Sequence, residues 1–259
     1  MIEPHRAWSI EQNDRRLSFA LGHDITAYAE TAAAAVACHR HPAWKVVLPV
    51  GGHTTIGTTA AAGLLVPPQL AHTCATSSAF VAIYVEPWCV RPGHGPARLR
   101  PSTVRRLLDA LGQDMDLASV QQELTTLTGP APVLDPRLAH AVRVCGQADR
   151  LDTVSAEVGL SPPRLRALVR STLGVPLVRL RQWQRLRTAV AALPDSPVAV
   201  AAATAGFADQ AHLTRVARDL SGRTPRSLTG AVCRQPCGRP AARGVPSTTL
   251  GTVAARLPS

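Results

Sequence analysis

One short stretch, residues 206–225, carries side chains whose chemistry suits a nucleic acid; it reads GFADQAHLTRVARDLSGRTP. Arginine can donate two parallel hydrogen bonds to guanine, and glutamine can pair with adenine in the same bidentate way. Arginine can also neutralise a backbone phosphate. The alternative is an ordinary solvated helix face, which this stretch alone does not exclude. The candidates for contact with DNA are Gln210, His212, Arg215 and Arg218.

A second group of residues could hold a metal ion or line a pocket. His39 and His41 alternate in a run that is typical of a β-strand, so they share one face of it. His72 and Cys74 do the same in a later run. Imidazole and thiolate are ligands that suit zinc or nickel. The same side chains could instead face an organic molecule, and both interpretations stay open at this point.

The elements that must position these residues change along the chain. Up to about residue 100, short β-branched or alternating runs cut by Gly, Pro and Thr predict an antiparallel sandwich or small barrel. The apolar spacing over residues 101–126 predicts one or two helices, and residues 129–136 predict a linker. The pattern is then helical to about residue 229. Residues 230–259, rich in Gly, Pro, Ser and Thr, predict a disordered basic tail.

The net charge of +11 is divided unevenly along the chain. Residues 1–133 carry 10 basic and 10 acidic side chains, whereas residues 134–229 carry 14 arginines against 7 acidic side chains. A local excess of arginine is the footprint of a polyanionic partner. We see no signal peptide and no membrane-spanning run, and the six cysteines have no framework spacing, so we expect a cytoplasmic protein with free thiols.

The helical part contains an internal repeat, residues 151–176 and residues 196–225. Each copy reads as a short helix, a glycine turn, a second helix and a glycine stop. This is the outline of a helix-turn-helix, and two copies in a basic region make it specific. Helix starts are predicted at capping residues, two of them followed by proline: Ser161, Ser196 and Asp209.

These motifs resemble the AraC/XylS-type transcriptional regulators. The resemblance rests on A-x-x-x-G-F-x-D-Q-x-H-L-x-R from Ala202 to Arg215, on GRTP at 222–225, and on AEVGLSPPRL from Ala156. The run RLRQWQRLRTAVAAL, between the copies, is similar to the linking helix of that family. The resemblance covers residues 134–229 and implies a double helix-turn-helix domain that binds double-stranded promoter or operator DNA.

The resemblance also implies which positions read bases. In the first copy they are Pro163, Arg166 and Ala167, of which only Arg166 is polar, with Arg164 as a second candidate. In the second copy they are Gln210, Ala211 and Arg215, while Arg170 and Arg218 lie later on their helices and suit phosphate. The linking helix carries further arginines that could meet phosphate. The expected DNA-binding side chains are Arg164, Arg166, Arg170, Gln210, His212, Arg215 and Arg218.

For residues 1–100 the resemblance implies a cupin-like domain that binds an effector and dimerises. CHRHPAWKVVLPVGG and LLVPPQLAHTC are similar to the two cupin motifs, but Lys45 stands about where a metal-binding cupin has its Glu ligand, and Gln69 replaces a Gly. We therefore expect an effector pocket at His39, His41 and His72, with no bound metal and no cofactor.

The predicted fold class is α+β and multidomain: an N-terminal antiparallel cupin-like β-barrel or sandwich (1–100), linker helices (101–133), a C-terminal all-α double helix-turn-helix (134–229) and the tail. The predicted function is sequence-specific DNA binding and regulation of transcription under a small-molecule effector, not catalysis. Expected partners are DNA, the effector, a second copy of the chain and RNA polymerase, but no membrane. The alternatives are a cupin-type metalloenzyme with a basic appendage, against which the missing Glu counts, and nonspecific nucleic-acid binding through arginine.

Overall fold

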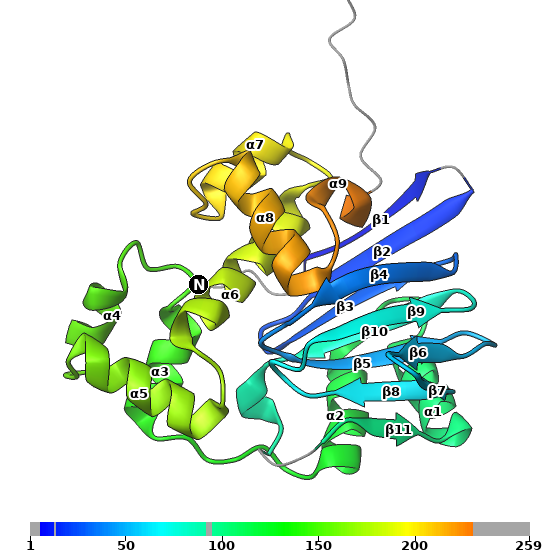
Figure 1. Cartoon of the computed structure of the whole chain (residues 1–259), viewed down its shortest axis with the longest axis horizontal. Helices are drawn as coiled ribbons and strands as arrows, with labels where there is room; N and C mark the ends of the chain where they lie inside the picture. The colour runs from blue at the N-terminus through cyan, green and yellow to red at the C-terminus, as the bar shows by residue number, and fades with distance from the viewer. Residues whose placement is uncertain (1–5, 13, 92–94, 230–259) are drawn as a thin grey trace, which may run out of the picture.

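The computed structural model describes residues 6–12, 14–91 and 95–229. Figure 1 shows a β-sandwich formed by the N-terminal residues and, beside it, a group of helices formed by the C-terminal ones. The predicted tail, residues 230–259, lies outside the described residues. Within the described ranges, no helix is both long enough and apolar enough to cross a membrane.

Two antiparallel sheets form the β-sandwich, with strand orders β1-β2-β3-β10-β5-β8-β11 and β4-β9-β6-β7. The central strands β5 and β10 are almost wholly apolar and pair antiparallel, with Ile83 opposite Val46 at the centre of the core. The strand bounds are β1 Arg6–Gln12, β2 Arg15–Leu21, β3 Ile25–Glu30, β4 Ala34–His39, β5 Trp44–Pro49, β6 Thr54–Ile56, β7 Thr59–Ala61, β8 Gly63–Val66, β9 His72–Thr76, β10 Phe80–Val85 and β11 Ala97–Leu99.

Two helices, α1 (Pro101–Leu111) and α2 (Leu117–Thr128), complete the core of the larger sheet. The buried stripe of α1 consists of Val104, Leu107 and Leu111, as the helical period requires. Gly63 on β8 permits the close approach of α1, because a Cβ at Gly63 would lie 2.6 Å from Val104 Cγ2.

The helical part consists of two helix-turn-helix units on either side of a linking helix, α6. In each unit a glycine with positive φ makes the turn (Gly159, 65°; Gly206, 78°), and another ends the second helix (Gly174 and Gly222, both 69°). The helix bounds are η1 Pro87–Cys89 (a 3-10 turn), α3 Pro136–Val144, α4 Leu151–Glu157, α5 Pro162–Leu173, α6 Leu177–Ala192, α7 Val198–Thr204, α8 Gln210–Ser221 and α9 Pro225–Thr229.

The linking helix α6 belongs to two apolar cores at once. Its first turns place Leu177 and Leu180 in the core of α3, α4 and α5. Its later turns place Trp183, Leu186 and Val190 in a core shared by α7, α8 and the β-sandwich. Its 16 residues span roughly 24 Å at 1.5 Å per residue. Both units are therefore held on one rigid element.

The predicted fold class is confirmed, and the helix starts are refined. Asp209 caps α8, with its carboxylate accepting from the His212 N–H at 2.6 Å. Ser161 is the N-cap of α5 but makes no side-chain cap bond, because Pro163 removes one of the two amides that a capping hydroxyl can reach. The expected start at Ser196 was one residue early: Pro197 is the N-cap of α7.

Buried ion pairs join the helices to the β-sandwich. Arg187 on α6 pairs with Glu86, and the Trp183 Nε1–H donates to the same carboxylate at 3.1 Å. Arg223, just after α8, pairs with Glu30 on β3 at 2.8 Å. Burial raises the pKa of Glu86, and the Arg187 guanidinium opposes that rise. The two parts therefore share one buried, charged interface.

Candidate nucleic-acid interface and effector cavity

The second helix-turn-helix presents a polar face of α8 to solvent. Gln210, Arg215 and Arg218 are exposed, whereas Leu213 and Leu220 are fully buried on the opposite face. The face that remains free carries amide and guanidinium donors, which are the groups that read base edges and neutralise phosphates.

His212 differs from the other predicted residues of α8. Its ring packs edge-on against Phe207, with centroids 5.3 Å apart, and it is half-buried. It therefore helps to fix the turn before α8, in addition to any contact with DNA.

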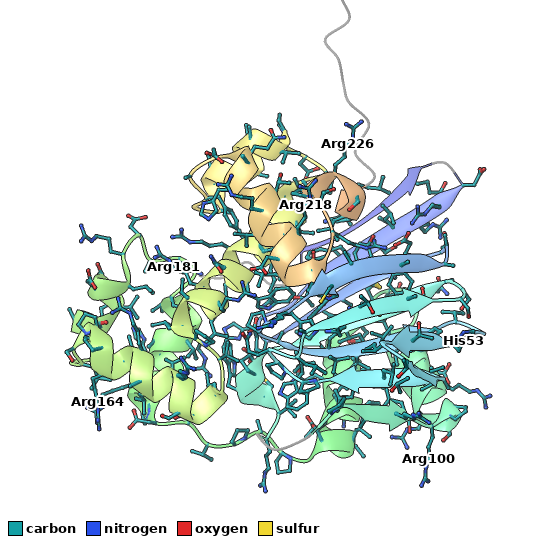
Figure 2. The ribbon with its side chains drawn as sticks, viewed as in Figure 1. His53, Arg100, Arg164, Arg181, Arg218 and Arg226 are labelled. Carbon is teal, nitrogen blue, oxygen red and sulfur yellow. The ribbon has the colours of Figure 1, made fainter. Side chains whose placement is uncertain are left out.

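The first helix-turn-helix repeats the arrangement on α5. Arg164, Arg166 and Arg170 are exposed, and Leu165 and Val169 are fully buried beneath them. Figure 2 shows Arg164 projecting from α5 on the side away from the β-sandwich, and Arg218 on α8 in the other unit. Among the residues that the structure describes, no carboxylate pairs with any of the five exposed arginines of these two helices: Arg164, Arg166, Arg170, Arg215 and Arg218.

The arginines of α6 make bonds within the protein instead. Arg181 donates to the carbonyls of Ala148 and Asp149 at 2.7 and 2.5 Å. Arg185 donates to the Gly146 carbonyl at 3.0 Å and also to that of Gly206. Arg179 pairs with Asp219, and Arg187 with Glu86. Sequence analysis considered these side chains for phosphate contact; the structure uses them to hold α6 to its neighbours.

A cavity lies between the two sheets and the helical part. The cavity is narrow: its empty space is about 720 Å³ when the part open to solvent is counted, but only about 60 Å³ of it can take the centre of a water molecule. Its walls are mostly apolar and come from both parts of the chain: Phe19, Tyr28, Val36, Cys74, Phe80 and Tyr84 from the strands, and Trp183, Leu186, Val190 and Leu228 from the helices.

Among the described residues, three with cationic side chains line the cavity, and two of them are paired with carboxylates. Arg187 and Arg223 pair with Glu86 and Glu30. The third, Lys45, is the only lysine in the sequence and is 4% exposed. Its Nζ lies 3.5 Å from His39 Nε2 and 5.7 Å from the centre of the Tyr84 ring. Within the described part of the chain, no carboxylate forms a salt bridge with Lys45.

The predicted pocket histidines form a cluster beside this cavity. One ring nitrogen from each of His39, His41 and His72 lies within 4.8 Å of the others, and all three residues are buried. Their rings are not part of the cavity wall, which Lys45 and Tyr84 form on that side. Cys74, which shares a face with His72, lines the cavity instead, with its Sγ 3.8 Å from Thr54 Oγ1.

The histidines are held by backbone carbonyls and are neutral at neutral pH. Burial lowers the pKa of His39 to about 3 and that of His72 to about 4, and the Lys45 ammonium acts in the same direction. The same two causes lower the pKa of His41 well below its usual value. Gln69, at a φ of 63°, anchors the segment after His41, because its N–H donates to the His41 carbonyl at 2.8 Å. Its positive φ explains why a glycine is usual at that position of the motif.

Comparison with known proteins agrees with this geometry. Residues 154–230, which include α5 to α9, match a family described as a helix-turn-helix domain. The C-terminal part of the chain therefore carries a helix-turn-helix domain, as the sequence resemblance predicted. No curated protein matches it.

Solved structures of ToxT from Vibrio cholerae are similar in fold to this chain. One, an apo form of a variant, has a TM-score of 0.54 at 11% identity and covers 80% of this chain and 96% of that one. A second has a TM-score of 0.52 at 9% identity, with coverage of 80% and 97%. A third, described as wild-type ToxT bound to an unsaturated fatty acid, has a TM-score of 0.46 at 10% identity, with coverage of 80% and 95%. At these identities the likeness concerns the fold alone.

Sequence analysis missed the charges of the cavity. Arg223, Glu30, Glu86 and Arg187 come from four separate segments, and each pairs with a residue that is distant in the sequence. The sequence signal that could have indicated these buried charges is a charged residue in an otherwise apolar run, as at Glu86 and at Lys45. Lys45 was noticed only as a departure from the cupin pattern.

Proposed function

We propose that this chain is an AraC-type regulator that reads a specific operator with α5 and α8, and that a small anionic effector in the cavity controls it. The observation that carries the proposal is the shared cavity wall: strands of the β-sandwich and helices of the DNA-binding part both contribute to it. A ligand in this position contacts both parts, so it can favour one arrangement of them over another.

The reading positions follow from exposure and charge. Arg166 and Arg164 on α5, with Gln210 and Arg215 on α8, are the proposed base-reading side chains. Arg170 and Arg218, together with His212, are proposed near the DNA backbone. The support is that these arginines are exposed and have no carboxylate partner among the described residues, whereas the arginines of α6 form bonds within the protein.

The remaining parts of the proposal concern organisation. We assign effector binding and dimerisation to residues 1–100, a linking role to residues 101–133 and DNA binding to residues 134–229. A second copy of the chain and RNA polymerase are the proposed protein partners, and the cytoplasm is the proposed location. These assignments are supported by the AraC-type resemblance of the sequence.

The chemistry of the cavity selects the class of effector. Apolar and aromatic walls favour a hydrocarbon body. The Lys45 ammonium, which has no carboxylate partner in the described part of the chain, favours a single negative charge. We therefore propose an amphipathic carboxylic acid whose carboxylate pairs with Lys45. The histidines lie on the far side of Lys45 and would contact the effector only at its charged end.

Calorimetric titration with oleate, and with methyl oleate as a neutral control, tests this assignment. Oleate should bind the full-length protein and the ester should not. Lys45→Gln should weaken oleate binding at least about tenfold, because it removes the partner of the carboxylate. Arg100→Gln, an exposed charge on the β-sandwich (Figure 2), should leave binding unchanged. Equal binding of acid and ester, or no effect of Lys45→Gln, would contradict the proposal.

A further inference from the structure

The cavity between the two sheets has a second polar position besides Lys45. Thr26 on β3 lines the cavity and is 3% exposed, and its Oγ1 makes no hydrogen bond to any described residue. A buried hydroxyl without a partner is costly, and native proteins rarely keep one without a use for it. A valine would fill the same space in a β-strand without this cost. The hydroxyl therefore indicates a polar contact with a molecule that occupies the cavity.

The register of the larger sheet fixes where Thr26 lies relative to Lys45. Tyr84 on β10 is opposite Thr26 on one side and opposite Lys45 on the other, so the three residues form one row across adjacent strands. All three line the cavity, as do the residues two positions away on the same strands, so this row faces the cavity. Neighbouring strands lie about 4.8 Å apart, which places the Cα atoms of Thr26 and Lys45 about 10 Å apart. The hydroxyl and the ammonium are therefore at opposite ends of one straight row.

Arg187 adds a hydrogen-bond donor at the Thr26 end of the row. Its side chain lines the cavity, and its Nη2 lies 3.4 Å from the carbonyl oxygen of Ile25, the residue before Thr26. Arg187 pairs with Glu86 through Nη1, but its buried Nε makes no hydrogen bond to any described residue. An oxygen atom of a ligand at this end could accept a hydrogen bond from either donor, the Nε–H or the Thr26 hydroxyl.

We propose that the effector carries a second oxygen function, a hydroxyl at the end of its chain opposite the carboxylate, and that Thr26 binds this hydroxyl. The inference rests on the proposed function, because it takes the carboxylate to be at Lys45. The cavity is narrow, which favours a single straight chain over a ring. A straight chain of about eight carbons, with bonds of about 1.5 Å, reaches across the row from Lys45 to Thr26. The class of effector is therefore a medium-chain ω-hydroxy acid.

The terminal hydroxyl of the ligand reverses the preference that an apolar cavity would have. In a cavity that offers it no partner, such a hydroxyl weakens binding, because it loses its hydrogen bonds to water. At Thr26 the ligand hydroxyl gains a partner, and the buried hydroxyl of the protein gains one as well. The ω-hydroxy acid should therefore bind about five- to tenfold more tightly than the unsubstituted acid of the same length.

The experiment is calorimetric titration of the full-length protein with octanoate and with 8-hydroxyoctanoate, and the wild type should prefer the hydroxy acid. Thr26→Val keeps the shape of the side chain and removes only the hydroxyl. This variant should bind octanoate no more weakly than the wild type does, and it should prefer octanoate to the hydroxy acid. Thr58→Val, at an exposed position between β6 and β7, is the matched control and should keep the wild-type preference. Lys45→Gln should weaken the binding of both acids alike and leave the ratio of their affinities unchanged.

The outcomes separate this inference from the proposed function. Equal binding of the two acids by the wild type, or a preference for octanoate, overturns the inference. A preference for the hydroxy acid that Thr26→Val retains overturns it as well. In each of these cases, weaker binding of both acids by Lys45→Gln would still support the carboxylate site. If neither octanoate nor oleate binds to the wild type, the proposed effector class is wrong and this inference fails with it.

Discussion

Truncation of two arginines on α8 separates base reading from phosphate contact. Arg215 and Arg218 lie one helical turn apart, and both are exposed. We expect Arg215→Ala to reduce preference for the operator and Arg218→Ala to weaken binding to every DNA sequence. The reason is that a base contact depends on sequence, whereas a phosphate contact does not.

The magnitudes follow from the positions of the two side chains. Neither arginine has a carboxylate partner in the described part of the chain, so truncation should change folding stability by no more than about 0.5 kcal/mol. Loss of a bidentate base contact costs about 1–3 kcal/mol, or roughly 5- to 160-fold in affinity for the operator. Loss of one phosphate contact reduces the slope of log affinity against log salt by about 0.9.

The assay is a titration of operator and scrambled DNA at several salt concentrations, after in vitro selection has defined the operator. Arg215→Ala should lose most on the operator and relax the preference at one or two base pairs. Arg218→Ala should lower both curves alike and flatten their salt dependence, and Arg100→Gln on the β-sandwich should do neither. If Arg215→Ala behaves as Arg218→Ala does, with unchanged sequence preference, α8 is not a reading helix.

Three further predictions concern stability. Arg187→Ala should lower the free energy of unfolding by about 3–5 kcal/mol, because Glu86 then stays buried without its cation; a loss below about 1 kcal/mol in urea denaturation would refute the buried pair. Leu213→Ala should cost about 2–5 kcal/mol and reduce binding to all DNA together, whereas normal stability would mean that α8 does not pack as described. In the presence of a metal chelator, the free energy of unfolding should be highest above about pH 6.5. It should decrease as the pH is lowered toward the pKa values of His39 and His72 in the folded state, which are about 3 and about 4. At about pH 5 each of these two histidines should account for about 2 kcal/mol of the loss, because only the unfolded chain takes up the proton; a flat profile between about pH 7.5 and 5 would contradict it.

The helix-turn-helix was predictable because its determinants are local. A capping aspartate at Asp209, glycines with positive φ at Gly206 and Gly222, and an apolar stripe through Leu213 each act within one or two helical turns. Because the helix-turn-helix occurs twice in the sequence, signals of this kind appear in both copies. The orientation of the α6 arginines was not predictable in this way, because α6 is packed on several sides and its polar positions face protein rather than solvent.

The histidine cluster was predictable only in part. Alternation along a strand predicted that His39 and His41 share a face; both are buried, but β4 ends at His39 and His41 lies in the segment that follows the strand. The convergence with His72 depends on the pairing of β4 with β9 and on its register shift, which a single sequence does not encode in any local pattern. That the Nε2 atoms of His41 and His72 have no hydrogen-bond partner among the described residues also follows only from the three-dimensional structure.

The cavity and the histidine cluster both adjoin the end of the helix that we propose to read DNA. Gly222, the C-cap of α8, lies so close to β4 that a Cβ there would be 3.0 Å from His39 Nδ1. The next residue, Arg223, reaches Glu30 in the cavity wall. An effector carboxylate that draws Lys45 further into the cavity would move its positive charge away from His39, which lies beside the end of α8. A ligand alters DNA binding only if it contacts the two arrangements of the chain unequally. In the described residues, the cavity adjoins the DNA-binding part where β4 meets the end of α8. We therefore expect a change of arrangement on ligand binding to occur at this contact.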